Sequence, residues 1–330
     1  MYSKIINVPI VLEIGENIFI HMDEILQRNH IFFKEKILVT SPELKELYKQ
    51  QVDLLSFDDI MLIQGGSYEE AHEVMGNITN KDALLVAFGG GSVIDAVKMI
   101  SNDLNLSYIT APSTLSNDAI YSPVARLVQK GKKQSFGVKA PLGIIADIEI
   151  IRRSPRKLLL AGVGDLVSNA SAVKDWKLAH AENGEHINNF ALTLATLSGN
   201  SVMSYTIDDI GTDRFIGDLA NGLVISGLAM VLANSSRPAS GAEHLISHAI
   251  DDLYPTRTTL HGLQVAWGQL LLERDYRQDH DDFEKLRTFF DRMKIIEEME
   301  HDIHFSSDEI ARITDRAKTI RDRYTILSKY

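Results

Sequence analysis

The sequence predicts an α/β N-terminal domain with a doubly wound parallel sheet, followed by an all-α C-terminal domain. As far as about residue 152, short apolar runs alternate with helical patterns, an order typical of parallel sheets covered by helices. Beyond that residue the strand signal stops and helical periodicity remains. A chain of 330 residues is long enough for two domains. We therefore predict one domain over residues 1–152 and a second over residues 153–330.

The first half begins with apolar residues at every second position over residues 6–14, which predicts a strand. A helical pattern follows over residues 18–30. Further strands are predicted where short runs are apolar on both parities, as expected when helices cover both faces of a sheet. These runs cover residues 36–40, 59–63, 83–88, 107–110 and 143–146, and the helical patterns between them lie at about 42–50, 68–78 and 92–102.

Helical patterns fill the second half, separated by glycines or polar clusters. They cover residues 156–180, 186–207, 213–233, 241–252, 261–277, 280–293 and 306–329. The last of these is charged and amphipathic, so we expect a solvated outer helix. A cleft between the two domains is the natural place for a small-molecule ligand.

Composition excludes several kinds of site. The chain has no cysteine, so disulfides and thiolate metal sites are excluded, and any metal must be held by His, Asp, Glu or water. A formal net charge of −11 without a basic stripe argues against a nucleic-acid partner. We find no run of about 20 apolar residues and no signal-peptide core, which predicts no membrane span. We therefore expect a cytoplasmic protein.

A glycine-rich turn joins a predicted buried strand to a predicted helix. Its sequence, Phe88-Gly-Gly-Gly-Ser-Val-Ile-Asp95, places the glycines directly before the helix. Glycines let a backbone approach a diphosphate closely, and a helix N-terminus offers N–H donors to it. Any tight turn can use such glycines, but the flanking strand and helix favour phosphate binding. The spacing differs from the Gly-x-Gly-x-x-Gly fingerprint of Rossmann folds.

Asp165 lies in a stretch, Gly162–His180, that predicts a helix opening near Gly164. A carboxylate in the first turn would be favoured by the helix dipole, so a simple capping role is the alternative to a functional one. Far downstream, Glu243-His244-Leu-Ile-Ser-His248 puts two imidazoles on one helix face, and His261 opens the next helical pattern. A lone helical histidine is usually structural, whereas a carboxylate and histidines together are ligand types for a metal.

These stretches resemble the sn-glycerol-1-phosphate dehydrogenases. That family belongs with iron-type alcohol dehydrogenases, glycerol dehydrogenases and dehydroquinate synthases, and the resemblance runs from about Lys36 to about Gly268. It implies a dehydroquinate synthase-like fold. It also implies that the diphosphate of NAD or NADP is held by Gly89, Gly90, Gly91, Ser92 and Asp95. Lys98 extends this pattern, although a lysine one turn further on is more often exposed.

A second segment, Pro112–Pro123, is dense in hydroxyls and turn formers, and an ordinary polar loop is the alternative. It is similar to the family pattern Pro-Thr-x-x-Ser-x-Asp-Gly-x-x-Ser-Pro, with mild departures at Ser113 and Ala119. The resemblance implies contacts to the nicotinamide half of the cofactor from Ser113, Thr114, Ser116 and Ser122. It implies a substrate contact and a catalytic role for Asp118.

The resemblance implies metal ligation by Asp165, His244 and His261, with a position left open for water or substrate. We expect zinc, with nickel or iron as alternatives, because this donor set accepts all three. His248 is expected to relay a proton or contact substrate rather than ligate.

Asp165 would also face the substrate, whose phosphate needs cations. Arg237 and Lys174 are the candidates, and each could instead be a salt-bridged residue.

The implied reaction interconverts dihydroxyacetone phosphate and sn-glycerol 1-phosphate for phospholipid synthesis. Related glycerol dehydrogenases lack the stretches Val173–His180 and Ser236–Gly241, which is our reason for preferring the phosphorylated substrate. A glycerol dehydrogenase, a dehydroquinate synthase-like cyclase and a non-catalytic metal or nucleotide sensor remain alternatives. Ser41-Pro42 follows a predicted strand where an acid would repel a 2′-phosphate, so NADP is expected to be tolerated. We also expect a homo-oligomer.

Overall fold

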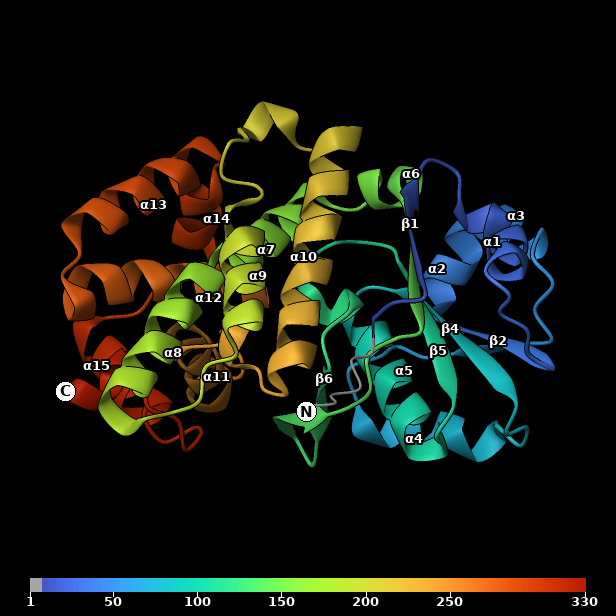
Figure 1. Ribbon diagram of the computed structural model, residues 1–330, viewed down its shortest axis with the longest axis horizontal. Coiled ribbons are helices and arrows are strands. Elements are labelled where there is room, and N and C mark those ends of the chain that lie inside the picture. The colour runs from blue at the N-terminus through green and yellow to red at the C-terminus, as the bar shows by residue number, and fades with distance from the viewer. Residues whose placement is uncertain (1–7) are drawn as a thin grey trace. The chain divides into compact units, whose positions relative to one another are not determined.

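The computed structural model describes residues 8–330 and divides into two compact units (Figure 1). The first unit holds the chain up to Leu115 together with Ala119–Ser154. The second unit holds Pro155–Tyr330 and also Ser116–Asp118, three residues from the hydroxyl-rich segment. Two of the residues in the predicted opening strand, Ile6 and Asn7, lie outside the described residues.

The first unit is built on a six-stranded sheet with the order β1-β8-β5-β4-β2-β3, in which every neighbouring pair is parallel. The strands are β1 (Val11–Gly15), β2 (Glu35–Thr40), β3 (Asp59–Leu62), β4 (Ala83–Gly89), β5 (Ser107–Pro112) and β8 (Gly143–Asp147). The helices are α1 (Met22–Arg28), α2 (Pro42–Leu47), α3 (Lys49–Asp53), α4 (Tyr68–Asn77), α5 (Gly91–Leu104) and α6 (Ile148–Arg152). The predicted parallel sheet is confirmed.

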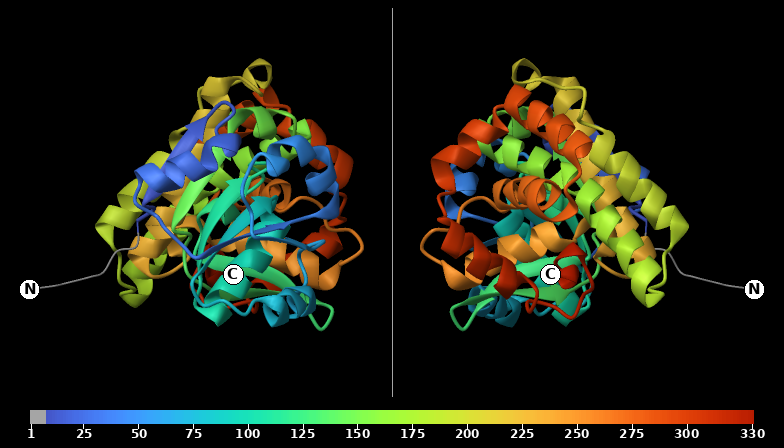
Figure 2. Two further views of the ribbon diagram at one scale, coloured as in Figure 1. Left: turned by 90° about the vertical axis from the view of Figure 1, so that its right-hand side faces the viewer. Right: turned by 90° about the vertical axis from the view of Figure 1, so that its left-hand side faces the viewer.

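The central strand β4 shows why the sheet is apolar on both parities. All of its residues are buried. Leu84, Val86 and Phe88 pack in one core with Met22 and Ile25 of α1, whereas α5 lies on the opposite face (Figures 1 and 2). Because helices cover both faces of the sheet, neither set of alternate residues in this strand faces solvent, and both sets can be apolar. This packing fixes the end of β4, where the glycine-rich turn begins.

Two features of the first unit differ from the sequence-based expectation. A two-stranded antiparallel hairpin, β6 (Val124–Gln129) and β7 (Lys132–Gly137), was not predicted. It turns at Lys130 and Gly131, which both have positive φ, as tight hairpin turns require. The opening strand begins only at Val11, and its buried residue is Val11 rather than the alternating set, since Ile10 and Leu12 are 58% and 42% exposed.

The second unit is helical, and its described residues contain no strand. The helices are α7 (Arg156–Val167), α8 (Asn169–Asn183), α9 (Asn189–Asn200), α10 (Asp213–Ala233), α11 (Ala242–Leu253), α12 (His261–Leu271), α13 (His280–Arg292), α14 (Ile295–Asp302) and α15 (Ser307–Ala317). A π-helical stretch, Leu272–Arg277, extends α12. The all-helical character predicted for this half is confirmed, although α14 was missed and the last helix is shorter than predicted.

The predicted helix around Asp165 was wrong in its limits. The chain forms two helices that meet at Ser168, and Asp165 lies in the last turn of α7 rather than in a first turn. Oγ of Ser168 donates to the carbonyl oxygen of Asp165 at 2.6 Å, a local bond of the kind that competes with the helical ladder. The dipole argument therefore fails, because a carboxylate at a helix C-terminus is disfavoured. Asp165 needs positive groups beside it.

One helix bears on the expectation that no segment spans a membrane, although Asp218 and Asn221 interrupt its apolar sequence. Helix α10 has 21 residues and is long and apolar enough to cross a membrane. In the structure, however, 67% of its most apolar stretch is buried inside the protein, which is typical of a core helix.

Candidate active site

Three of the predicted site residues come together in the second unit. Asp165 is carried by α7, His244 by α11, and His261 is the first residue of α12. Their potential ligand atoms all lie within 4.8 Å of one another. Oδ1 of Asp165 is 3.4 Å from Nε2 of His244 and 3.8 Å from Nε2 of His261. Asp165 and His244 are buried, whereas the His261 side chain is 26% exposed, so solvent reaches the cluster from the side of His261.

Two glycines allow the helices that carry these residues to pack backbone against backbone. A β-carbon on Gly164 would lie 2.5 Å from the carbonyl oxygen of Gly262, and one on Gly262 would lie 1.8 Å from that of Ala161. Neither position has room for a side chain. Because Gly164 precedes Asp165 and Gly262 follows His261, this close approach of α7 and α12 brings the carboxylate and the imidazole together.

Hydrogen bonds behind the two imidazoles orient both rings. Oε1 of Glu243 lies 3.0 Å from Nδ1 of His244, and a carboxylate only accepts, so Nδ1 carries the hydrogen of the neutral ring. Oγ of Ser247 donates to Oε1 of Gln264 at 2.7 Å and lies 2.9 Å from Nδ1 of His261. Since a hydroxyl has one hydrogen, His261 donates from Nδ1. When the two rings are neutral, each therefore carries its lone pair on Nε2, the atom that faces the carboxylate.

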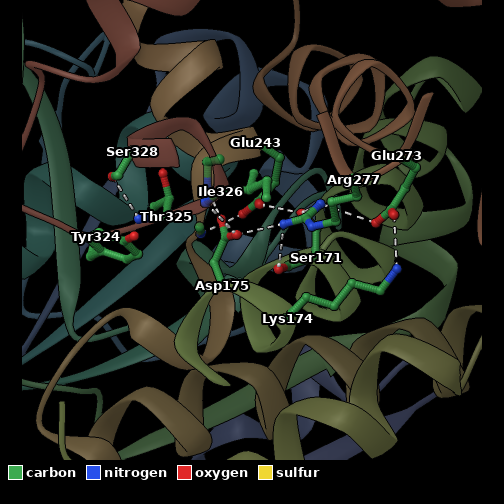
Figure 3. A network of polar contacts seen from close by, with 12 residues as sticks. Ser171, Lys174, Asp175, Glu243, Glu273, Arg277, Tyr324, Thr325, Ile326 and Ser328 are labelled. Carbon is green, nitrogen blue, oxygen red and sulfur yellow. Dashed lines mark hydrogen bonds and ion pairs between the residues drawn. The ribbon is translucent and has the colours of Figure 1, made fainter. Parts of the chain in front are cut away.

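Glu243 is itself held by a buried polar network, shown in Figure 3. Its carboxylate accepts a hydrogen bond from Oγ of Ser171 at 2.7 Å. Arg277 donates to the same Oγ at 3.0 Å and to Oδ1 of Asp175 at 2.7 Å. Asp175 in turn accepts from the backbone nitrogen of Ile326 at 3.1 Å. The network thus ties the helix that carries the first imidazole to α8 and to the C-terminal segment.

The charges of the cluster favour a cation. Burial alone would raise the pKa of Asp165, but His244 and His261 hold that pKa below its usual value. Burial would lower the pKa of His244, whereas its contacts with Asp165 and Glu243 raise the pKa to about 9. Two carboxylates thus hold a positive charge between them, which a proton on His244 supplies. A divalent cation can take the place of this proton.

The donor set fits a divalent metal ion. A carboxylate oxygen and two imidazole nitrogens are ligands that zinc, nickel and iron accept, and three protein ligands leave a coordination position open. Oδ1 of Asp165 is buried and accepts no hydrogen bond from the residues that the structure describes, so this atom can serve as a ligand. Oδ2 of the same carboxylate is fixed by the backbone nitrogen of Asp118 at 3.0 Å.

In the first unit, the glycine-rich turn leads from β4 into the N-terminus of α5, which Gly90 caps. A β-carbon on Gly89 would lie 2.6 Å from Cβ of Val93, so this position must be glycine for the turn to form. Ser92 is exposed in the first turn of α5. Thr114 is buried, and its Oγ1 has no hydrogen-bond partner in the described part of the chain. Free N–H groups and an unpartnered hydroxyl are suited to an anion.

Sequence reasoning missed a pair of glycines that packs against this turn. Gly65 and Gly66, which follow β3, both have φ of +84°. A β-carbon on Gly65 would lie 2.9 Å from the backbone nitrogen of Val93, and the backbone nitrogen of Gly66 donates to the carbonyl oxygen of Ser92 at 3.2 Å. The Gly-Gly pair, one residue after a predicted strand, was the signal that could have identified them.

The sequence is similar to that of known dehydrogenases. The sequence family described as "Iron-containing alcohol dehydrogenase" matches residues 13–155. The glycerol-1-phosphate dehydrogenase [NAD(P)+] of Pyrococcus horikoshii is 33% identical over 325 residues, covering 96% of this chain and 92% of that protein. The enzyme of the same name from Archaeoglobus fulgidus is 38% identical, covering 83% of this chain and 78% of that protein.

The chain belongs to the glycerol-1-phosphate dehydrogenase family. Its fold is also that of solved structures from the wider group. A glycerol dehydrogenase from Schizosaccharomyces pombe superposes with a TM-score of 0.79 at 19% identity, covering 99% of this chain and 86% of that one. A probable glycerol dehydrogenase from Sinorhizobium meliloti gives 0.77 at 16% identity, with 98% and 93% covered. At these identities the two structures establish the fold.

In this family member, two of the residues predicted to contact the cofactor are buried and bonded within the protein. Oδ1 of Asp95 lies 2.9 Å from Nζ of Lys98, and Oδ2 accepts from the backbone nitrogen of Arg126 at 2.9 Å. Nζ of Lys98 also donates to Oγ of Ser122 at 3.0 Å. Lys98 is fully buried, so the expectation that it is exposed was wrong. These contacts fix α5 to the hairpin, while direct cofactor binding by Asp95 and Ser122 stays a prediction.

The remaining predicted residues are placed as follows. Ser113 is partly exposed, and its backbone nitrogen donates to the carbonyl oxygen of Gly89 at 3.0 Å, so it adjoins the glycine-rich turn. Ser116 and Asp118 belong to the second unit. The His248 ring stacks beside that of His261 with centroids 6.0 Å apart, which places His248 next to the accessible side of the cluster.

The two cations predicted for the substrate phosphate are neutralised inside the protein. Nζ of Lys174 lies 2.6 Å from Oδ2 of Asp282 and 2.9 Å from Oε2 of Glu273. Arg237 is 4% exposed, and its Nε and Nη2 both donate to the carboxylate of Glu185. The structure therefore favours the salt-bridged alternative for both residues, because a phosphate would have to compete with these carboxylates.

Proposed function

We propose that this chain is a metal-dependent dehydrogenase that interconverts dihydroxyacetone phosphate and sn-glycerol 1-phosphate, with NAD or NADP as hydride carrier. The observation that carries the proposal is the convergence of Asp165, His244 and His261 in a member of this family. The names of the relatives support both the substrate and the cofactor. The product would be the glycerophosphate unit of phospholipids.

The second unit would hold the metal through Oδ1 of Asp165 and Nε2 of His244 and His261. A divalent ion at this position, zinc by preference, supplies a Lewis acid that polarises the C–O bond at the reacting carbon. The protein's own contribution is to hold three ligand atoms in place before substrate arrives. Glu243 does this for His244, and the backbone of Asp118 does it for Asp165, each through a hydrogen bond to an atom other than the proposed ligand atom.

The first unit would hold the dinucleotide. The N–H groups at the start of α5, with Ser92 and the Oγ1 of Thr114, are suited to the diphosphate and the groups beside it. Ser41 caps α2 directly after β2, where an acidic residue would repel a 2′-phosphate, which supports tolerance of NADP. A bound nicotinamide would supply or accept the hydride at the reacting carbon, and a proton would pass to or from the oxygen on that carbon. His248 would move that proton, while the Asp118 side chain would orient the hydroxyls.

The test is NAD(P)H oxidation with dihydroxyacetone phosphate, measured before and after removal of metal with a chelator. We expect turnover that disappears with the chelator and returns with zinc, nickel or iron. The stereochemistry is checked by offering the product to dehydrogenases specific for the sn-1 or the sn-3 phosphate. Glycerol serves as the control substrate.

Three outcomes would contradict the proposal, each in favour of one alternative. Oxidation of glycerol without reduction of the phosphate ester would indicate a glycerol dehydrogenase. Conversion of a sugar-type phosphate without net change in NADH would indicate a cyclase. Binding of NAD(P) in calorimetry without turnover of any small polyol would indicate a sensor.

A further inference from the structure

Three guanidinium groups gather where two segments of the second unit meet. Arg237 lies in the turn that precedes α11, and Arg321 and Arg323 lie in the segment that follows α15. Arg323 is largely buried, and its pKa is lowered to about 10, first by that burial and then by the charges of Arg237 and Arg321. So much like charge is unusual in a chain whose net charge is −11. A buried guanidinium normally has an anionic partner.

The arginines differ in what they contact. The guanidinium of Arg237 is paired with the carboxylate of Glu185 and also donates to the carbonyl oxygen of Tyr324 at 2.8 Å. Arg323 has neutral partners: Nη1 donates to the carbonyl oxygen of Ser240, and Nη2 donates to Oγ of Ser236 at 2.8 Å. Within residues 8–330, no carboxylate forms an ion pair with Arg323. Its charge is therefore not balanced by direct contact.

The Oγ of Ser236 marks the point on which the donors converge. It accepts from Nη2 of Arg323 and from Nη1 of Arg321, the latter at 3.4 Å. A neutral hydroxyl between two guanidinium groups is a weak acceptor for such donors, whereas a phosphate offers several charged oxygens in matching geometry. Ser236, Arg321 and Arg323 each keep part of their surface exposed, whereas Arg237 is buried.

We infer that Ser236, Arg321 and Arg323 form a binding site for a phosphate group, either free inorganic phosphate or the phosphate of a small phosphorylated molecule. The site uses none of the residues that surround the metal cluster. It also differs from the pair Lys174 and Arg237, whose charges are already matched by carboxylates. We name these three residues the phosphate site.

The first test is calorimetric titration of the full chain with inorganic phosphate, at an ionic strength held constant with chloride. We expect saturable binding of one phosphate per chain, weakened at least ~10-fold by Arg321→Gln or Arg323→Gln, the scale of a charged hydrogen bond. Arg312→Gln is the matched control, because Arg312 is exposed on α15 and its loss changes the net charge equally. Absence of saturable binding, or equal binding by all variants, would overturn the inference.

Ser236→Asp gives a second test that does not depend on removing a buried arginine. The new carboxylate would lie beside Arg323 and supply, within the chain, the negative charge that Arg323 does not contact directly. We expect a higher unfolding temperature than for the wild type, together with loss of phosphate binding. A variant that is destabilised and still binds phosphate would overturn the inference.

Enzyme kinetics can distinguish the two sources of the phosphate group. Of the three experiments, only this kinetic one rests on the proposed function. If the substrate phosphate occupies the site, inorganic phosphate inhibits competitively and Arg321→Gln raises the KM for dihydroxyacetone phosphate. If free phosphate is the ligand, the KM is unchanged although calorimetry shows weakened phosphate binding. Both results support the site. Calorimetry needs no turnover, so failure of the proposed activity is distinguishable from failure of this inference.

Discussion

A β-carbon at Gly262 would lie 1.8 Å from the carbonyl oxygen of Ala161. This contact holds α12 against α7 and thereby places His261 beside Asp165. We expect Gly262→Ala to force the two helices apart, to lower the free energy of unfolding by about 3 kcal/mol, and to weaken metal binding. Denaturant unfolding and measurement of metal content check both effects.

Gly217→Ala is the matched control, because a β-carbon at this position in α10 meets nothing within 4 Å. Helix propensity alone then predicts a gain of roughly 0.5 to 1 kcal/mol in stability and unchanged metal content. If both substitutions had the same effect, the close approach of α7 and α12 would not be what maintains the cluster.

Removal of a ligand should remove the metal. We expect Asp165→Ala or His261→Ala to lower metal stoichiometry and to abolish turnover, because two remaining ligands hold a divalent ion weakly. His248→Ala is the comparison: it should keep the metal and slow the reaction, since this imidazole lies beside the cluster without being assigned as a ligand. Unchanged metal content in the Asp165 variant would refute the ligand assignment.

Glu243 should act on the metal through His244. The carboxylate accepts hydrogen bonds from Nδ1 of His244, Oγ of Ser171 and the backbone nitrogen of Gly241. The side-chain amide of glutamine has the same shape but only one accepting oxygen. In Glu243→Gln, its NH2 group would therefore face one of the groups that now donate to Glu243. We expect metal affinity to fall about 10- to 100-fold, with activity partly restored by excess metal. Glu284→Gln, on the exposed side of α13, is the control. A variant that loses activity yet binds metal as the wild type does would contradict this role.

Asp302 should make the stability of the second unit depend on acidity. Burial would raise its pKa, but Lys157, Thr259 and His301 lower the pKa from 3.8 to about 2. Because the folded pKa is depressed, the stabilisation is present above about pH 4 and is lost as pH falls toward 2. It amounts to about 2 kcal/mol at neutral pH. We expect Asp302→Asn to lower the free energy of unfolding at pH 7, and by roughly half as much at pH 3. An equal difference at both pH values would show that the carboxylate charge is not responsible.

Much of the fold could be predicted because its signals are local. The run at residues 83–88 is apolar on both parities, and that pattern alone predicts a strand covered on both faces. The hairpin was missed because its second strand lacks such a local signal. Strand β7 consists largely of polar residues such as Lys132, Lys133 and Gln134 and has no alternating apolar pattern. The break at Ser168 was missed because one side-chain hydrogen bond decides it.

The site was predictable in kind but not in arrangement. Residue types and motifs identified Asp165, His244 and His261, whereas their proximity depends on glycine contacts between helices far apart in the sequence. The partners of Lys174 and Arg237 were not predictable, because Glu273 and Glu185 lie 99 and 52 residues away and no local pattern connects them. Pairing of charges over such separations is decided by tertiary packing.

The glycine pair after β3 should affect the dinucleotide without affecting the metal. Gly65 has φ of +84°, and a β-carbon there would lie 2.9 Å from the backbone of Ser92 and Val93, at the start of α5. Gly65→Ala should therefore displace the turn whose N–H groups we propose to bind the diphosphate. Calorimetric titration with NAD or NADP should show affinity reduced at least ~10-fold, the equivalent of one lost charged hydrogen bond.

The hairpin glycine provides a control with the same backbone strain. Gly131 also has positive φ, +76°, but a β-carbon there meets nothing within 4 Å. Any effect common to Gly65→Ala and Gly131→Ala is therefore due to the left-handed backbone, and the remainder is due to contact with α5. Reduced NAD(P) affinity in the first variant alone, with full metal content in both, would separate dinucleotide binding from metal binding. Equal NAD(P) affinity in the two variants would mean that Gly65 does not shape the cofactor turn.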